Sequence, residues 1–148
     1  MADREDPLVA FHFGLEVAGT LSGLFTHVGG LGSETEVVEH KVISEGKVEA
    51  VMMVPGRLKW TPITLKRGVT GNLDIWDWRQ KVVEGKMKDA RKAASIIAYS
   101  EDGTAVARWN LTNAWPSKVT GPEFDSTTGN IMFEEVTIVF EGVVRVKP

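Results

Sequence analysis

The 148-residue chain contains no cysteine and only one tyrosine. The absence of cysteine excludes disulfide bonds, thiol nucleophiles and zinc sites built on cysteine, and it is compatible with a reducing compartment. No apolar run approaches the roughly 20 residues of a membrane-spanning helix, so we expect no membrane insertion by the monomer. The acidic N-terminus lacks the basic and then apolar segments of a secretory signal peptide.

Histidine is also scarce, with only His12, His27 and His40 in the chain. None of the three lies in the spacing of a zinc-binding pair, and a solvent-facing or hydrogen-bonded structural role is the default for each. No serine lies in a GxSxG elbow, and the glycines of residues 29–32 lack the lysine and serine or threonine of a phosphate-binding loop. We therefore predict no catalytic residue, no metal site and no cofactor.

Two carboxylate pairs, Glu34 with Glu36 and Glu134 with Glu135, are the remaining candidates for acid–base chemistry. Residues two apart on a strand share a face, so Glu34, Glu36 and His40 are expected on one surface. A solvated acidic surface is the interpretation that we favour.

The net charge is −3, but residues 1–50, 51–100 and 101–148 carry −6, +6 and −3. Folding either mixes these charges over one surface or creates complementary faces that meet between copies of the chain. The overall acidity argues against specific nucleic-acid binding.

The stretch 58–85 holds three of the five tryptophans and the one strongly helical segment. Its apolar stripe at helical spacing consists of Ile75, Trp78 and Val82. Capping residues precede this stripe and Gly85 follows it, so we predict a helix over about 73–84. Because one short helix cannot form a core alone, it must lie across a sheet.

Apolar alternation predicts strands in most of the remaining chain, over residues 11–17, 21–28, 33–42, 58–65, 93–99, 105–112 and 131–146. The alternation slips at Pro62 and again at Glu134–Glu135, which predicts a bulge at each position. Trp115–Pro116 is expected to end or bend a strand, and 86–92 to be a solvated connector. Trp60 and Trp109 are expected to join the helix stripe in the core. The result is a mainly β fold: a β-barrel or sandwich of six to eight strands with one flanking helix.

Residues 43–56 allow two interpretations. Either they form a hairpin whose second strand belongs to the core, or they form an extended loop whose apolar tip is buried against a neighbouring subunit. The adjacent methionines of the cluster Val51–Val54 suit such an adaptable contact.

Several phrases together resemble the phage tail tube protein family, in particular the inner-tube proteins of contractile injection systems. They are PLVAFHFGLEV, GLFTHVGGLGSETEVVEH, PGRLKWTPITLKRGVTG, LDIWDWRQKVVEGK and ARWNLTNAWPSKVTGPEFD. The resemblance runs from about Pro7 to Val146, so we expect a single tail tube domain over 1–148 that is similar to Hcp and tail tube proteins. The resemblance implies a non-enzymatic protomer of hexameric rings, which stack into a hollow tube inside a contractile sheath.

The resemblance also implies partners and locations. The expected partners are other copies of the chain, the sheath protein, the baseplate or tube-initiator and cap proteins, and protein cargo in the lumen. Assembly is expected in the cytoplasm of a bacterial or archaeal producer, and the tube is then part of a released or membrane-anchored particle or of a virion tail. Residues 1–7 are expected to be a tail.

The segment 41–56 is expected to be an extended stacking loop. Its candidate contacts between rings are Val48, Val51, Met52, Met53 and Val54. Glu34 and Glu36 are the candidates for the polar lumen surface. Two alternatives to an injection tube remain: an Hcp-like secreted ring and effector carrier of a type VI system, or a small-ligand-binding β-barrel. A small-ligand-binding β-barrel would need a pocket with convergent polar groups, and the sequence gives no sign of one.

Overall fold

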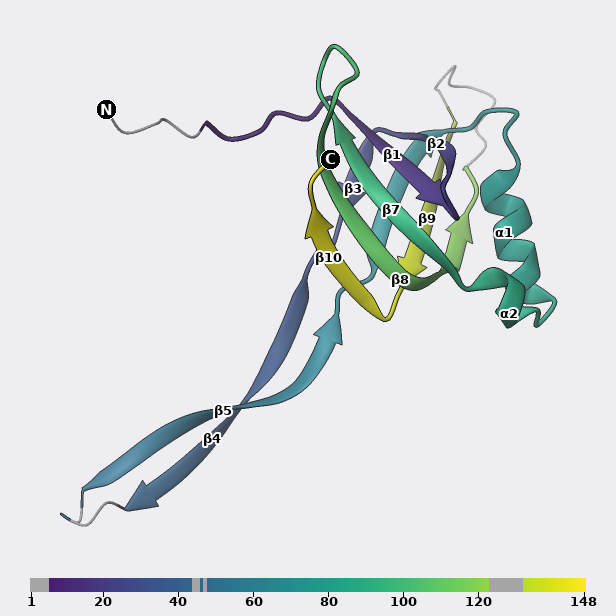
Figure 1. The fold of residues 1–148 in the computed structure, drawn as a ribbon. Helices are drawn as coiled ribbons and strands as arrows, with labels where there is room; N and C mark the ends of the chain where they lie inside the picture. Colours follow the sequence, from purple (N-terminus) through teal and green to yellow (C-terminus); the bar gives the residue numbers. More distant parts are fainter. Residues whose placement is uncertain (1–5, 44–45, 47, 123–131) are drawn as a thin grey trace, which may run out of the picture.

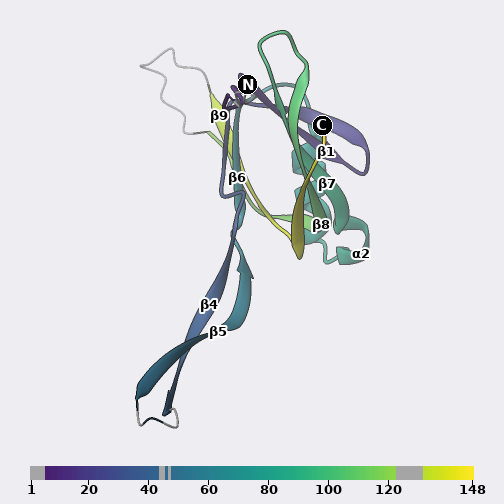
Figure 2. The same ribbon diagram turned by 60° about the vertical axis from the view of Figure 1, so that its left-hand side comes forward.

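The computed structural model describes residues 6–43, 46, 48–122 and 132–148. These residues contain ten strands and two helices. Eight strands form one antiparallel sheet that curls into an open barrel, which we call the body (Figures 1 and 2). The other two strands, β4 (Ser33–Ile43) and β5 (Glu49–Trp60), form a separate hairpin that projects far from the body, and we call it the arm.

The sheet of the body has the order β2-β1-β7-β8-β9-β6-β3, with β10 also paired to β8. Its strands are β1 (His12–Val17), β2 (Thr20–Phe25), β3 (His27–Gly29), β6 (Ile63–Gly68), β7 (Lys92–Tyr99), β8 (Ala105–Thr120), β9 (Phe133–Val139) and β10 (Gly142–Val146). The mainly β fold is therefore confirmed, although the barrel does not close.

The long strand β8 joins the two halves of the body. Its first half pairs with β7 and β10, and its second half pairs with β9. The register shifts between Pro116 and Lys118, because proline has no N–H to donate to the ladder. Trp115–Pro116 therefore disturbs the strand without ending it, and β8 continues to Thr120.

Helix α1 (Asp74–Val83) packs against β8 and confirms the helix predicted over 73–84. A second helix, α2 (Met87–Ala90), lies in the segment expected to be a solvated connector. Most of this segment is exposed, as expected, but Ala90 is fully buried and its carbonyl oxygen accepts a hydrogen bond of 2.6 Å from the Trp78 indole.

The predicted strand over 58–65 is in fact two strands in two different sheets. β5 ends at Trp60 and β6 begins at Ile63. Here the chain passes Gly30, whose φ is +92° and whose absent Cβ would lie 2.2 Å from the carbonyl oxygen of Pro62. Only glycine permits this approach, so the phase slip marks the junction of arm and body. The predicted strand 21–28 is likewise divided, into β2 and β3.

The bulge predicted at Glu134–Glu135 does not exist in the ladder between β6 and β9, which runs regularly from Gly68 opposite Phe133 to Ile63 opposite Ile138. Glu134 itself is buried, as are Val136 and Ile138 two and four residues later. The apparent slip arose because a charged residue occupies an inward position.

Candidate assembly interface

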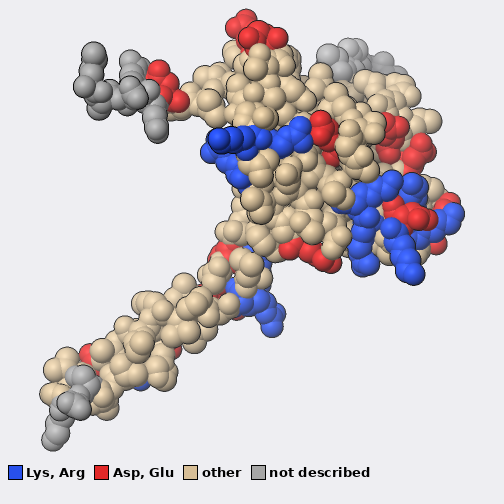
Figure 3. All heavy atoms as spheres, in the orientation of Figure 1, with Lys and Arg blue, Asp and Glu red and all other residues tan. Residues whose placement is uncertain are grey.

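The arm presents apolar side chains to solvent along its whole length. The exposed ones are Val37, Val38, Ile43, Val48, Val51, Met52, Met53, Val54 and Leu58. Exposure reaches 64% for Met53 and 79% for Ile43. On the face that Figure 3 shows, most of the arm's surface belongs to uncharged residues. An isolated two-stranded hairpin is marginally stable at best in water, so these side chains are expected to need a partner.

The ladder register assigns the residues of the arm to two faces. Partners directly opposite each other share a face. One face carries Val38 opposite Val54 and His40 opposite Met52. The other face carries the pairs Val37 and Pro55, Glu39 and Met53, Lys41 and Val51, and Ile43 and Glu49. Both faces carry exposed apolar side chains, and the second also carries Glu39, Lys41 and Glu49, so a single flat partner surface cannot cover the arm.

The predicted contact residues therefore do not form one patch. Met52 and Val54 lie on one face, whereas Val51 and Met53 lie on the other. Val48 is exposed just before β5 begins. Sequence proximity suggested a cluster at the tip of a loop, but a strand places neighbouring side chains on opposite sides.

Glu34 and Glu36 lie near the base of the arm, and both are exposed. The register shifts in this region between Thr35 and Val37, where Gly56 lies close to Glu36. The extra residue of this shift lies on β5, so the side chains of β4 continue to alternate between the two sides. Glu34, Glu36 and His40 therefore lie on the same side of β4.

The five residues expected in the core differ in burial. Ile75 and Trp78 are buried against the body, while Val82 on the same helix is half-buried. Trp60 is half-buried at the end of β5 and packs on Phe140, with ring centroids 6.1 Å apart. Trp109 is also half-buried and lies beneath the Arg145 guanidinium, 5.7 Å from its ring centroid.

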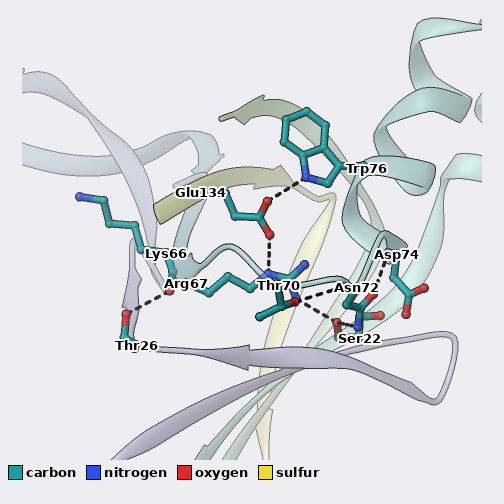
Figure 4. Close-up of polar contacts among 9 residues, drawn as sticks. All are labelled: Ser22, Thr26, Lys66, Arg67, Thr70, Asn72, Asp74, Trp76 and Glu134. Carbon is teal, nitrogen blue, oxygen red and sulfur yellow. Dashed lines mark hydrogen bonds and ion pairs between the residues drawn. The ribbon is translucent and has the colours of Figure 1, made fainter. Parts of the chain in front are cut away.

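A buried ion pair in the body has no counterpart among the sequence predictions. The Arg67 Nε atom lies 2.6 Å from an oxygen of Glu134, and each residue is only 5% exposed (Figure 4). The second carboxylate oxygen accepts a hydrogen bond of 2.8 Å from the Trp76 indole. Arg67 also donates to the carbonyl oxygen of Ser22 at 3.3 Å and lies over the ring of Phe25.

Arg67 thereby connects strands β2, β6 and β9, and the Trp76 bond adds helix α1. Gly23 leaves the space for it, since a Cβ there would lie 2.3 Å from Arg67 Nη1. One signal in the sequence could have revealed the cluster: Arg67 continues the buried alternation of Ile63 and Leu65. A charge at such a position indicates a buried partner.

Within the described ranges, no three histidine, aspartate or glutamate side chains approach closely enough to hold a metal ion. His12, His27 and His40 lie on three different strands and are all exposed. Among these same ranges, no helix has the length and apolarity needed to cross a membrane.

Residues 9–144 match the model of the T4-like virus tail tube protein gp19 family. This match spans most of the chain and includes the arm and nearly all of the body. The chain belongs to this tail tube family. A search with the whole chain found no significant match among curated protein sequences.

Among solved structures, the tail tube protein is similar to a chain of the extended PVC sheath–tube complex of an extracellular contractile injection system. The two are 25% identical, with 97% of this chain and 94% of that chain covered and a TM-score of 0.74. A chain of the extended PVC sheath/tube terminator is 26% identical, with coverages of 96% and 98% and a TM-score of 0.72.

Hcp1 from Flavobacterium johnsoniae shares the fold at 18% identity, with coverages of 93% and 97% and a TM-score of 0.54. The resemblance inferred from the sequence phrases is thus confirmed at the level of the family and the fold.

Proposed function

We propose that this tail tube protein is the protomer of the inner tube of a contractile injection system. In this proposal six copies form a ring, and rings stack into a hollow tube that a contracting sheath drives through a target envelope. The match to the tail tube family and the likeness to a chain of the PVC sheath–tube complex support it. The role is mechanical and requires neither catalysis nor a cofactor.

The observation that carries this proposal is the arm. Full burial of one large aliphatic side chain or methionine contributes about 1.5–3 kcal/mol. Several such side chains on two faces therefore provide a strong drive for association. We assign Val48, Val51, Met52, Met53 and Val54 to contacts between successive rings, with different neighbours on the two faces. In this proposal the chain is a single tail tube domain, and its projecting segment serves for stacking.

We propose that the ring closes through the open edges of the sheet and not through the arm. Among the described residues, β3 pairs only with β6 and β10 pairs only with β8. Unpaired edges invite pairing with other chains, and a closed ring of subunits removes them. We propose that Glu34 and Glu36 face the lumen, where a polar wall does not retain a moving protein cargo.

The further partners in this proposal are the sheath protein, a baseplate or tube initiator, and a cap. Similar chains occur in structures of a sheath–tube complex, a tube-terminating cap and a baseplate. We place assembly in the cytoplasm of the producing cell and the finished tube in a released or membrane-anchored particle or a virion tail.

Negative-stain electron microscopy of the purified protein over a range of concentrations, together with its solution mass, tests the proposal. We expect hexameric rings and stacked tubes at high concentration. If the protein remains monomeric, addition of a baseplate-capped tube end should nucleate tubes. A protein that stays monomeric even then is not a tube protomer.

The fold shared with Hcp1 favours a second candidate, a secreted Hcp-like ring that carries effectors. The two candidates differ in that the injection tube works inside the sheath of an injection particle, whereas the Hcp-like carrier is released as rings without that sheath. Co-purification of the tube with its sheath protein from the producer supports the injection tube. Rings that are released without any sheath support the Hcp-like carrier.

A further inference from the structure

A second apolar surface lies at the mouth of the body, between the N-terminal segment and strands β7, β8 and β10. It is an open groove of about 570 Å³, and we call it the docking groove. Leu8, Phe13, Ala98, Val106, Trp109 and Arg145 are among its lining residues. Asp6 and Arg145 are the charged residues of its lining and the others are apolar, so it lacks the set of convergent polar groups that a small-ligand site has.

The docking groove is an uncovered part of the core-facing side of the sheet. Trp109 pairs with the fully buried Ile96, and Phe13 pairs with the buried Ala98. Cross-strand partners share a face, so Phe13 and Trp109 point to the core side. Both pack against the core and are only half-buried, so each keeps an exposed part that lines the groove.

Arg145 adds a positive charge to this apolar surface. It pairs with Trp109 across the edge of the sheet, and its guanidinium lies over the indole ring. It forms no ion pair with any described residue. The groove has one carboxylate of its own, Asp6, but Asp6 forms no ion pair with Arg145. An occupant with apolar side chains beside a carboxylate would therefore complement this part of the docking groove.

One face of the arm has this composition. Met53 and Val51 are exposed on it, and Glu39 stands directly opposite Met53. On the same face Lys41 lies 3.7 Å from Glu49, so its charge is largely balanced. Glu39 is then the carboxylate of this face that is available to a partner.

The arm and the N-terminal segment that lines the docking groove leave opposite ends of the body (Figures 1 and 2). Two different surfaces at opposite ends of one chain produce a head-to-tail contact, which repeats as an open stack. We propose that the docking groove of one copy receives the arm of a second copy, with Met53 and Val51 against Phe13 and Trp109 and with Glu39 facing Arg145. This inference rests on the proposed function, since the second copy belongs to the next ring.

Cysteine cross-linking tests the contact cleanly, because the chain has no cysteine of its own. The variant Met53→Cys/Val106→Cys places one thiol on the proposed arm face and one in the docking groove. Oxidation of its tubes should give a ladder of covalently linked copies, whereas each single variant should give none beyond a dimer. The matched control Met52→Cys/Val106→Cys places the arm thiol on the other face, and its ladder should be lost because a disulfide requires closely apposed Cβ atoms.

A charge exchange provides a second readout that does not depend on oxidation. Glu39→Arg and Arg145→Glu should each reduce stacking of rings into tubes, and the double variant should restore it. The control Lys88→Glu changes an exposed charge on α2 and should leave stacking unchanged.

The outcomes separate this inference from the proposed function. Intact tubes without the Met53–Val106 ladder and without charge rescue overturn the docking contact and leave the tube in place. Such tubes would have another occupant in the docking groove, such as a cap protein. A wild-type chain that forms no ring or tube on a baseplate overturns both.

Discussion

Arg67 and Glu134 show how single residues organise the body. Bringing two charges out of water is costly, and the cost is recovered only when hydrogen bonds satisfy both partners. Here the carboxylate accepts bonds from Arg67 and from the Trp76 indole, and the guanidinium also donates to the Ser22 carbonyl oxygen, while among the described residues its Nη2 atom has no hydrogen-bond partner. The cluster therefore specifies how β2, β6, β9 and α1 meet.

Removal of one partner should leave an uncompensated buried charge. We expect Arg67→Met to reduce the free energy of unfolding by about 3–5 kcal/mol, measured by urea denaturation. The double variant Arg67→Met/Glu134→Leu should recover most of this loss. The control Lys66→Met removes an exposed ion pair of 4.0 Å with Glu135 and should cost at most about 1 kcal/mol. Equal effects of the two single variants would contradict the assigned role.

Trp78 is the residue that fixes helix α1 to the body. It is buried, and its indole reaches the carbonyl oxygen of Ala90. Trp78→Ala should lower the free energy of unfolding by about 3–5 kcal/mol through the cavity that it leaves. Trp78→Phe retains most of the volume and should cost less. A loss below about 1 kcal/mol for Trp78→Ala would mean that the helix does not pack through this residue.

At the scale of elements, the arm separates assembly from folding. Its strands pair only with each other among the described parts of the chain, and Trp60 is the arm residue that packs on the core, so changes in residues 37–55 are expected to leave the core of the body intact.

Replacing Met52 and Met53 together by aspartate should therefore block ring stacking without loss of the fold. The reason is that both side chains are solvent-exposed in the free chain, whereas the stacked tube would bury the new charges. Electron microscopy should show rings without tubes, and circular dichroism should show an unchanged thermal transition. Val83→Asp, at an exposed position of α1, is the matched control. Intact tubes from the double variant would refute the stacking role.

The turn between β7 and β8 should depend on pH. The Ser100 hydroxyl and the Thr104 backbone N–H donate hydrogen bonds to the Asp102 carboxylate and lower the pKa of Asp102 to about 2 from its usual 3.8. A lowered folded-state pKa means that the contribution to stability is complete above the unfolded pKa and is lost as the pH falls through the folded one.

We therefore expect the turn to loosen between about pH 4 and pH 2. The protection of the Thr104 amide against hydrogen exchange, relative to the intrinsic rate at each pH, should fall in this window, and Asp102→Ala should remove this pH dependence. An Asp102 carboxyl that titrates near 3.8 by NMR would contradict the hydrogen-bonded turn.

At the scale of the molecule, the body is expected to be a self-sufficient folding unit. Its core of buried aliphatic and aromatic residues comes from β1, β2, β6–β9 and α1, and no residue of the arm except Trp60 packs against it.

A variant in which a short turn replaces residues 37–55 should therefore fold with a thermal midpoint close to that of the wild-type chain. It should also fail to form tubes, because the stacking contacts are absent. Calorimetry and analytical ultracentrifugation measure the two properties. A large fall in the thermal midpoint would show that the arm contributes to the stability of the body.

Much of the architecture could be predicted from local pattern. A strand or helix with one apolar face shows it in consecutive residues. This is the case for the alternation over 11–17 and 105–111 and for the helical spacing from Ile75 to Val82. The corresponding strands and helix are present. The family was also accessible, because its phrases are contiguous in the sequence. Most of the tail predicted over 1–7 lies outside the described residues.

The tertiary structure alone decided what covers each apolar face. Strands β4 and β5 contain apolar residues as the strands of the body do, yet they project from the body and leave apolar side chains exposed on both faces. Arg67 and Glu134 are 67 residues apart in the sequence, so no local pattern could pair them. By itself the sequence determined most of the strands, helix α1 and the family of this protein. Whether an apolar face becomes core or interface depends on long-range packing, which only the folded chain reveals.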